Sequence, residues 1–103
     1  MYELEMNETV PENLKENTHD MMKRVIEIAP YSSTCRGLVV QTEEGFKIQV
    51  EVRSAVGILS GLGESPQYSE ALKEAERGVG KEIDQWRKLR FRDQGLDRFA
   101  SAL

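Results

Sequence analysis

Basic side chains that could bind phosphate are concentrated in one stretch of this 103-residue chain. Residues 77 to 92 contain six of them and only two acidic residues, Glu82 and Asp84. Clustered lysine and arginine can neutralise the phosphates of a nucleic acid, but cations near the end of a helix also interact with its dipole and with solvent. The sequence leaves both interpretations open for these residues, which are Arg77, Lys81, Arg87, Lys88, Arg90 and Arg92.

Few other residues have types and spacings that suggest chemistry. His19 has no second histidine or cysteine at metal-ligand spacing, so we expect no metal there. The thiol of Cys35, next to Arg36, could have a lowered pKa, although a lone cysteine beside a strand is more often inert packing. Gly61-Leu-Gly63 lacks the Gly-Lys-Ser/Thr element of a phosphate loop. Because no nucleophile is paired with a base, we expect neither an enzyme nor a cofactor.

Length and composition indicate one compact domain, since 39% of the residues are apolar and 31% are charged. We assign residues 1 to 92 to a single α+β domain and residues 93 to 103 to a C-terminal tail that could form a short helix. The single cysteine cannot make an internal disulfide, and no charged leader opens the chain. No apolar run approaches the roughly 20 residues of a membrane helix. These features predict a soluble protein of the reducing cytoplasm.

Charge is unevenly distributed along the chain, although the net charge of −4 argues against a general polyanion binder. Residues 1 to 30 carry seven acidic and three basic side chains, whereas the basic cluster lies in the last third of the chain. A phosphate ligand should therefore meet the second half of the sequence.

The clearest element is a strand over residues 46 to 53, in which apolar and polar residues alternate without a break. Glu43-Glu-Gly45 is a hairpin-length loop that connects it to a preceding strand at 36 to 42. Residues 55 to 63 form a third strand-like run, whose glycines permit bulges or the close approach of another backbone. The polar face of the strand at 46 to 53 must meet solvent or a partner. It carries Lys47, Gln49, Glu51 and Arg53.

A short strand at Tyr2 to Met6 and two amphipathic helices complete the pattern. The first helix should run from about residue 11 to 28, with Pro11 in its first turn. The second should start at Ser65-Pro66 with the serine as cap, and Trp86 lies on its apolar stripe. Gly78 and Gly80 predict that this helix either packs closely on the sheet or bends. Its apolar stripe comprises Leu72, Ala75, Val79, Ile83 and Trp86.

The element order predicts an α+β fold, a β-α-β-β-β-α two-layer sandwich with an antiparallel meander, both helices on one sheet face and the other face uncovered. With this order of elements the chain resembles the hibernation-promoting factor and ribosome-associated inhibitor family. The fold of that family is akin to a double-stranded-RNA-binding domain with an added first strand. The resemblance covers roughly residues 2 to 90. It is carried by 36 to 53 (RGLVVQTEEGFKIQVEVR), a Gly-rich strand, and a helix that opens with SPQY at 65 to 68 and closes with QWRKLR at 85 to 90.

The resemblance implies a ribosome-associated protein that binds the rRNA of the small ribosomal subunit and inhibits translation in resting cells. Family members contact rRNA largely through basic side chains on and near the helices. The positions of this sequence that match are Lys23, Arg24, Arg77, Lys81, Arg87 and Lys88.

The alternative is a non-enzymatic protein-interaction module of the same fold. It would act through the exposed sheet face or through an apolar tail, and either surface could also form a homodimer. One continuous positive patch made by the six basic residues would favour RNA binding, and acidic interruptions would favour the module. The acidic residues of the second helix are Glu70, Glu74, Glu76, Glu82 and Asp84, and the apolar tail residues are Leu96, Phe99, Ala100 and Leu103.

Overall fold

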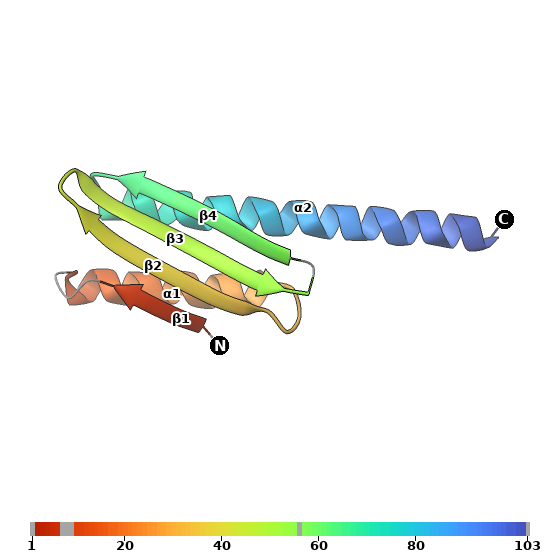
Figure 1. The fold of residues 1–103 in the computed structure, drawn as a ribbon, viewed down its shortest axis with the longest axis horizontal. Helices are drawn as coiled ribbons and strands as arrows, with labels where there is room; N and C mark the ends of the chain where they lie inside the picture. The colour runs from red at the N-terminus through yellow and green to blue at the C-terminus, as the bar shows by residue number, and fades with distance from the viewer. Residues whose placement is uncertain (1, 7–9, 56, 103) are drawn as a thin grey trace.

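The computed structural model describes residues 2–6, 10–55 and 57–102, with side chains described up to Leu89. Its elements follow the predicted order β-α-β-β-β-α, so the predicted α+β fold is confirmed (Figure 1). They are β1 (Tyr2–Met6), α1 (Glu12–Ile28), β2 (Thr34–Thr42), β3 (Gly45–Ser54), β4 (Gly57–Ser65) and α2 (Tyr68–Ala102).

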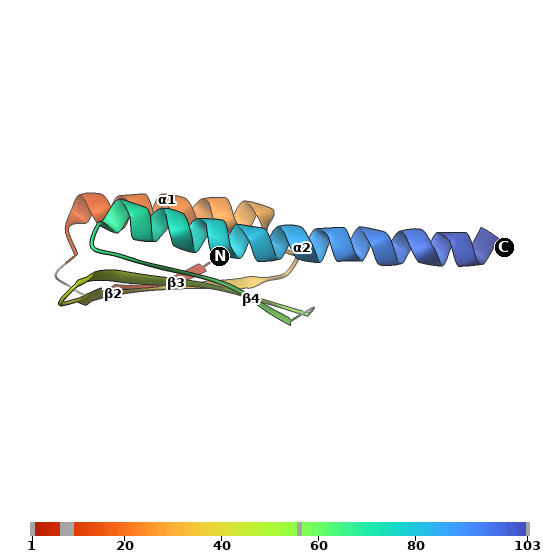
Figure 2. The ribbon, with the colours of Figure 1, turned by 90° about the horizontal axis from the view of Figure 1, so that it is seen from above.

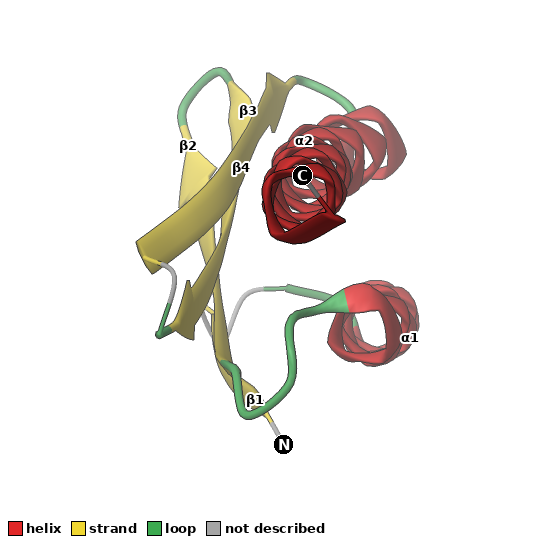
Figure 3. Cartoon of the chain, turned by 90° about the vertical axis from the view of Figure 1, so that its right-hand side faces the viewer, coloured by secondary structure: helices red, strands yellow, loops and turns green. Residues whose placement is uncertain are grey.

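The strands form one sheet in the order β1-β2-β3-β4. β2, β3 and β4 are the predicted antiparallel meander, while β1 pairs parallel to β2 because α1 carries the chain back to the start of the sheet. Both helices cover the same face of the sheet and leave the other face open (Figures 2 and 3). The structure is thus the two-layer arrangement that the sequence predicts.

The core lies between this sheet face and the helices. Ile48, Val50 and Val52 of β3 are fully buried, which confirms the predicted apolar face of the strand. Cys35 of β2 is buried beside them, and burial raises the pKa of its thiol, which agrees with the packing interpretation of this residue. The helices bury Met21, Met22 and Val25 of α1 and Ala71, Leu72, Ala75, Val79 and Ile83 of α2.

Glycines bring the backbones of β4 and α2 into direct contact. A Cβ atom placed on Gly63 would lie 1.8 Å from the carbonyl oxygen of Ala71, and one on Gly61 would lie 2.2 Å from that of Ala75. On the helix side, a Cβ on Gly78 would lie 3.1 Å from the Cα of Gly61. Of the two alternatives for the helix glycines, close packing is therefore correct at Gly78.

Several element boundaries differ from the predicted ones. Pro11 is the N-cap of α1 and lies outside the helix, and β2 begins at Thr34. The hydroxyl of Ser65 accepts a hydrogen bond from the Gln67 N–H at 3.2 Å, but α2 begins only at Tyr68. α2 then continues without interruption to Ala102 and extends past the end of the sheet (Figures 1 and 2), so the segment from 93 is a continuation of α2 and no separate short helix forms.

Candidate nucleic-acid interface

A row of basic residues follows the exposed side of α2. The helix buries Ala75, Val79 and Ile83 against the sheet. Lys73, Arg77 and Lys81 are exposed and follow one another at intervals of four residues, which places neighbours about 6 Å apart along the helix axis. We name these three residues the α2 basic row. Within the described side chains none of them forms an ion pair, so their charges are available to a ligand.

Lys73 is the member of this row that the sequence prediction missed. Counting basic residues from position 77 onward leaves it out, because acidic residues surround it in the sequence. The four-residue spacing to Arg77 and Lys81 is the signal that could have found it.

Three acidic side chains of α2 are directed away from the row. The carboxylates of Glu74 and Glu82 accept hydrogen bonds from β4, from the backbone N–H groups of Glu64 at 3.2 Å and Ser60 at 2.7 Å. Glu70 accepts one from the Ser65 hydroxyl at 3.2 Å. These partners draw the three carboxylates toward the sheet. Asp84, three residues after Lys81, stays on the exposed side of the helix near the α2 basic row and pairs with Lys88.

Arg24 is engaged by Glu76, a fourth acidic residue of α2. Its Nε and Nη2 donate to the two carboxylate oxygens of Glu76, each at 2.9 Å, and this pair joins α1 to α2. Donating these hydrogen bonds to Glu76 raises the pKa of the Arg24 guanidinium. Bidentate pairing of this kind occupies the donors that a phosphate would use. Arg24 is therefore a bridge between the helices in this structure.

Two further predicted residues, both in the middle of α2, have intramolecular partners. Arg87 donates from Nη2 to the backbone carbonyl of Ile28 at 2.6 Å, and so satisfies a carbonyl in the last turn of α1. Lys88 pairs with Asp84 at 3.2 Å, one turn earlier on the same helix. Because α2 continues to Ala102, the expectation that these cations lie at the end of their own helix is wrong: Arg87 bonds to the end of α1, and Lys88 forms an ion pair within α2. Both side chains are exposed.

Lys23 lies on the exposed side of α1, with Asp20 three residues before it and Glu27 four residues after it. The six predicted residues thus have different surroundings. Arg77 and Lys81 belong to the α2 basic row, Lys23 has acidic neighbours, and the other three have intramolecular partners. Acidic partners and neighbours therefore interrupt the single continuous patch that would have favoured RNA binding over the interaction module, and the cations that remain without an ion pair along α2 are those of the α2 basic row.

A groove of about 250 Å³ lies between the helices next to the row. Beneath it the hydroxyls of Thr18 and Tyr68 form a buried hydrogen bond, and Thr18 also donates to the carbonyl of Leu14 at 2.7 Å. Burial raises the pKa of the Tyr68 phenol, which keeps it neutral. The residues that line the groove are Leu14, Asn17, Asp20, Arg24, Tyr68, Ser69, Leu72, Lys73 and Glu76.

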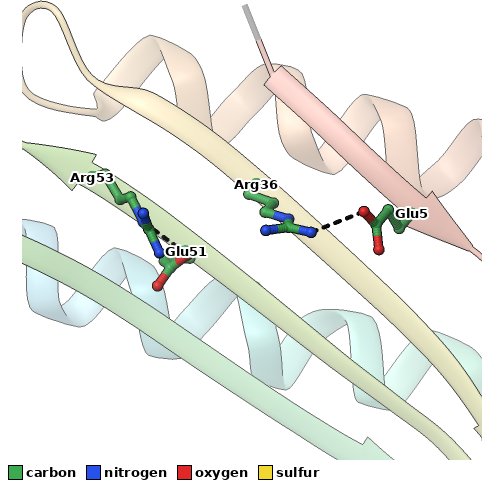
Figure 4. A network of polar contacts seen from close by, with 4 residues as sticks. All are labelled: Glu5, Arg36, Glu51 and Arg53. Atoms are coloured by element: carbon green, nitrogen blue, oxygen red, sulfur yellow. Dashed lines mark hydrogen bonds and ion pairs between the residues drawn. The ribbon is translucent and has the colours of Figure 1, made fainter.

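The open face of the sheet has a different character. Arg36 pairs with Glu5 at 2.8 Å, which raises the pKa of the Arg36 guanidinium, and Arg53 pairs with Glu51 at 3.3 Å (Figure 4). The outward residues of β2, β3 and β4 that the structure describes include no aromatic side chain on which a base could stack. They do include three exposed apolar residues, Leu38, Ile58 and Leu62.

No protein-family profile matches the sequence, and no curated protein is similar to it in sequence. The β-α-β-β-β-α arrangement places the chain in the α+β fold class of ribosomal interface proteins. A ribosomal subunit interface protein from Coxiella burnetii superposes with a TM-score of 0.68 at 11% identity, over 85% of this chain and 99% of that one. The N-terminal domain of Protein Y from Thermus thermophilus gives a TM-score of 0.60 at 10% identity, over 86% of this chain and 97% of that domain.

Both of these proteins are members of the hibernation-promoting factor family, so the predicted resemblance is confirmed for the fold. In the described part of the chain no helix is both long enough and apolar enough to span a membrane. The described residues also contain no group of three or more His, Cys, Asp or Glu side chains that could hold a metal ion.

Proposed function

We propose that this chain is a cytoplasmic, ribosome-associated protein that binds rRNA of the small ribosomal subunit and inhibits translation in resting cells. The observation that carries the proposal is the α2 basic row, whose three exposed cations form no ion pair among the described side chains, on a fold shared with a ribosomal subunit interface protein. Arg77 and Lys81 would contact phosphates together with Lys73. The other predicted residues, Lys23, Arg24, Arg87 and Lys88, would contribute at the margins.

The geometry of the row suits a run of phosphates. Lys73 and Lys81 are eight residues apart, which corresponds to about 12 Å along the helix axis. Structured RNA is recognised mainly through its shape and its backbone, and contacts of this kind need exposed cations more than base-reading side chains. The absence of aromatic residues from the described part of the open sheet face gives a further reason to place the RNA on the helices.

The test is co-sedimentation with small ribosomal subunits and a binding titration against structured rRNA at several salt concentrations. We expect the triple variant K73A/R77A/K81A to lose at least about tenfold in affinity at low salt, and its log-log salt slope to be shallower by about two to three, since each phosphate contact contributes roughly 0.7 to 0.9. An in vitro translation assay would then show inhibition by the native chain and much less by the triple variant.

The matched control is K15A/K47A/R53A, which removes the same number of positive charges away from the row. Lys47 and Arg53 are exposed on β3, and Lys15 pairs with Glu12 on α1. If both triple variants lose affinity equally, binding follows net charge alone and the assignment to α2 is wrong. If the native chain binds neither subunits nor rRNA at low salt, the proposed function itself is wrong.

A second candidate function is a protein-interaction module, and the exposed apolar residues of the open sheet face favour it. Leu38 and Leu62 flank Gln49 in one row across β2, β3 and β4. A hollow of about 200 Å³ is lined by Leu38 and Gln49 of this row together with Arg36 and Glu51. If this function holds, L38S/L62S would abolish ribosome association and K73A/R77A/K81A would leave it intact. RNA binding through α2 predicts the opposite pattern.

A further inference from the structure

The groove between α1 and α2 adjoins the α2 basic row, because Lys73 belongs to both. At one end of the groove, Arg24 donates two hydrogen bonds to Glu76, each at 2.9 Å, and so holds the two helices together. An RNA backbone that follows the row passes the mouth of this groove. The nucleotide nearest Lys73 can therefore reach into it.

The floor of the groove is apolar. Tyr68 and Leu72 line it from α2 and are 5% and 9% exposed, and Leu14 lines it from α1. The Tyr68 hydroxyl is bonded to Thr18 beneath the groove, so this residue presents its ring and not its polar group. A flat aromatic ligand gains by covering apolar surface of this kind. At about 250 Å³ the groove is smaller than the roughly 300–1,000 Å³ of sites that enclose a drug-sized ligand, so it suits one ring system.

The side chains that line the groove carry no net charge. Arg24 and Lys73 bring two positive charges to it. Asp20 and Glu76 bring two negative charges. A phosphate inside the groove would face two like charges, whereas a neutral base meets none. The row and the groove thus suit different parts of one nucleotide, its phosphate and its base.

The α1 side of the groove offers hydrogen-bonding groups that are not in use. Within the described residues, neither the Asp20 carboxylate nor the amide of Asn17, three residues earlier, forms a hydrogen bond or an ion pair. A carboxylate with both oxygens free can accept two parallel N–H bonds. Among the bases of RNA only guanine has two adjacent N–H donors, at N1 and N2, on its pairing edge. The Asn17 amide can donate to the O6 atom beside them.

We propose that the groove between the helices is a binding site for one unpaired guanine of rRNA, whose N1–H and N2–H groups donate to Asp20 while its phosphate lies on the α2 basic row. This inference rests on the proposed function and adds a base-specific contact to it. Proteins read RNA sequence mainly at unpaired positions, where a base can leave the stack and expose its pairing edge. The row supplies affinity, and the groove supplies the preference for guanine.

The test uses the full chain and four RNA hairpins that differ only in one bulged nucleotide, which is G, A, C or U. We expect the native chain to bind the G hairpin about tenfold more tightly than the other three, because a good bidentate pair discriminates between bases by roughly this factor. Inosine lacks only the N2 amino group of guanine, so an inosine bulge should reduce the preference to about threefold or less.

The place of the base is tested by NMR with mononucleotides. Guanosine monophosphate should shift the backbone amide signals of the groove residues Asn17, Asp20 and Ser69. Inosine monophosphate carries the same phosphate and should shift them less, because it has one donor fewer for the carboxylate.

Variants separate the groove from the row. Asp20→Ala removes the paired acceptor, and the four hairpins should then bind within about twofold of one another. The matched control is Glu27→Ala, which removes the same charge from an exposed position of α1 outside the groove and should keep the preference. R77A/K81A should weaken binding of all four hairpins by a similar factor and also keep the preference.

Three results would overturn the guanine site. The first is equal binding of the four hairpins by the native chain; if R77A/K81A still weakens this binding, the proposed function stands without the guanine site. The second is a preference that Asp20→Ala retains or that Glu27→Ala loses equally, since the base would then lie elsewhere or follow the charge of α1. The third is a native chain that binds neither the hairpins nor small ribosomal subunits at low salt, which overturns the proposed function as well.

Discussion

The hydroxyls of Thr18 and Tyr68 share a hydrogen bond beneath the interhelical groove, but they differ in how many other partners they have. Thr18 also bonds the carbonyl of Leu14, whereas no other partner of the Tyr68 hydroxyl is present among the described residues. A buried polar group that loses its only partner costs more than one that keeps a second. The effect of a substitution in this fold therefore depends on the partners of the residue more than on its type. Arg24, which is paired with Glu76, is a second example.

We therefore predict an asymmetry between two conservative substitutions. Thr18→Val leaves the buried Tyr68 hydroxyl without a partner and should lower the free energy of unfolding by about 1–3 kcal/mol. Tyr68→Phe leaves Thr18 bonded to Leu14 and should cost only about 0.5–1.5 kcal/mol. Urea unfolding of both variants and of the double variant T18V/Y68F measures the difference. An equal loss in the two single variants would contradict this account of the hydrogen bond.

At the scale of elements, β4 and α2 pack closely because glycines, which have no side chain, line their contact. Gly61 and Gly63 face the helix while the larger residues Ile58 and Leu62 face solvent. This inversion brings the helix close enough for Glu74 and Glu82 to reach the strand edge. Because Glu74 and Glu82 bond to β4, their carboxylates lie away from the α2 basic row. The packing of β4 on α2 therefore affects the charge of the candidate interface.

Substitution by alanine should have opposite effects on stability at a closely packed glycine, Gly63, and at one with open space around it, Gly80. Gly63→Ala would place a Cβ 1.8 Å from the Ala71 carbonyl oxygen, so backbone must shift, and we expect a loss of about 2–4 kcal/mol in unfolding free energy. Gly80→Ala is the control, because nothing lies within 4 Å of its Cβ. Within a helix that change should stabilise by up to about 1 kcal/mol. In thermal unfolding we expect the midpoint temperature to fall for Gly63→Ala and to rise for Gly80→Ala. An unchanged midpoint for Gly63→Ala would show that the close approach is not required.

The strand over residues 46–53 was predictable because its alternation is unbroken, and the faces of β3 follow that pattern. The parallel pairing of β1 was not stated by the sequence prediction, since five alternating residues do not specify a neighbour. For the site, Arg77 and Lys81 were found as part of a dense basic stretch. The directions of the Glu74, Glu76 and Glu82 side chains could not be predicted, because their partners lie on β4 and α1 and the sequence does not show how those elements pack against α2.

At the scale of the whole molecule, the chain is elongated, with extents of 60 × 24 × 17 Å, because α2 continues past the sheet (Figure 1). The described buried residues of α2 end at Ile83, with Trp86 partly buried one turn later. The α2 basic row lies entirely within the part of the helix that the sheet supports. Folding and the proposed RNA contact should therefore depend on the same segment, and residues beyond it should contribute little to either.

This separation makes the predicted domain of residues 1–92 testable. A chain that ends at residue 92 retains every described core residue and the whole α2 basic row, so we expect its unfolding free energy in urea to lie within about 1 kcal/mol of that of the full chain. Its affinity for rRNA should be unchanged within about threefold, since the row supplies the proposed phosphate contacts. A truncation at residue 80 is the control, because it removes the buried Ile83 together with Lys81 and should lower both stability and affinity. If the chain of residues 1–92 unfolds or fails to bind rRNA while the full chain binds, then the segment from 93 onward belongs to the functional domain, and the division of the chain at residue 92 is wrong.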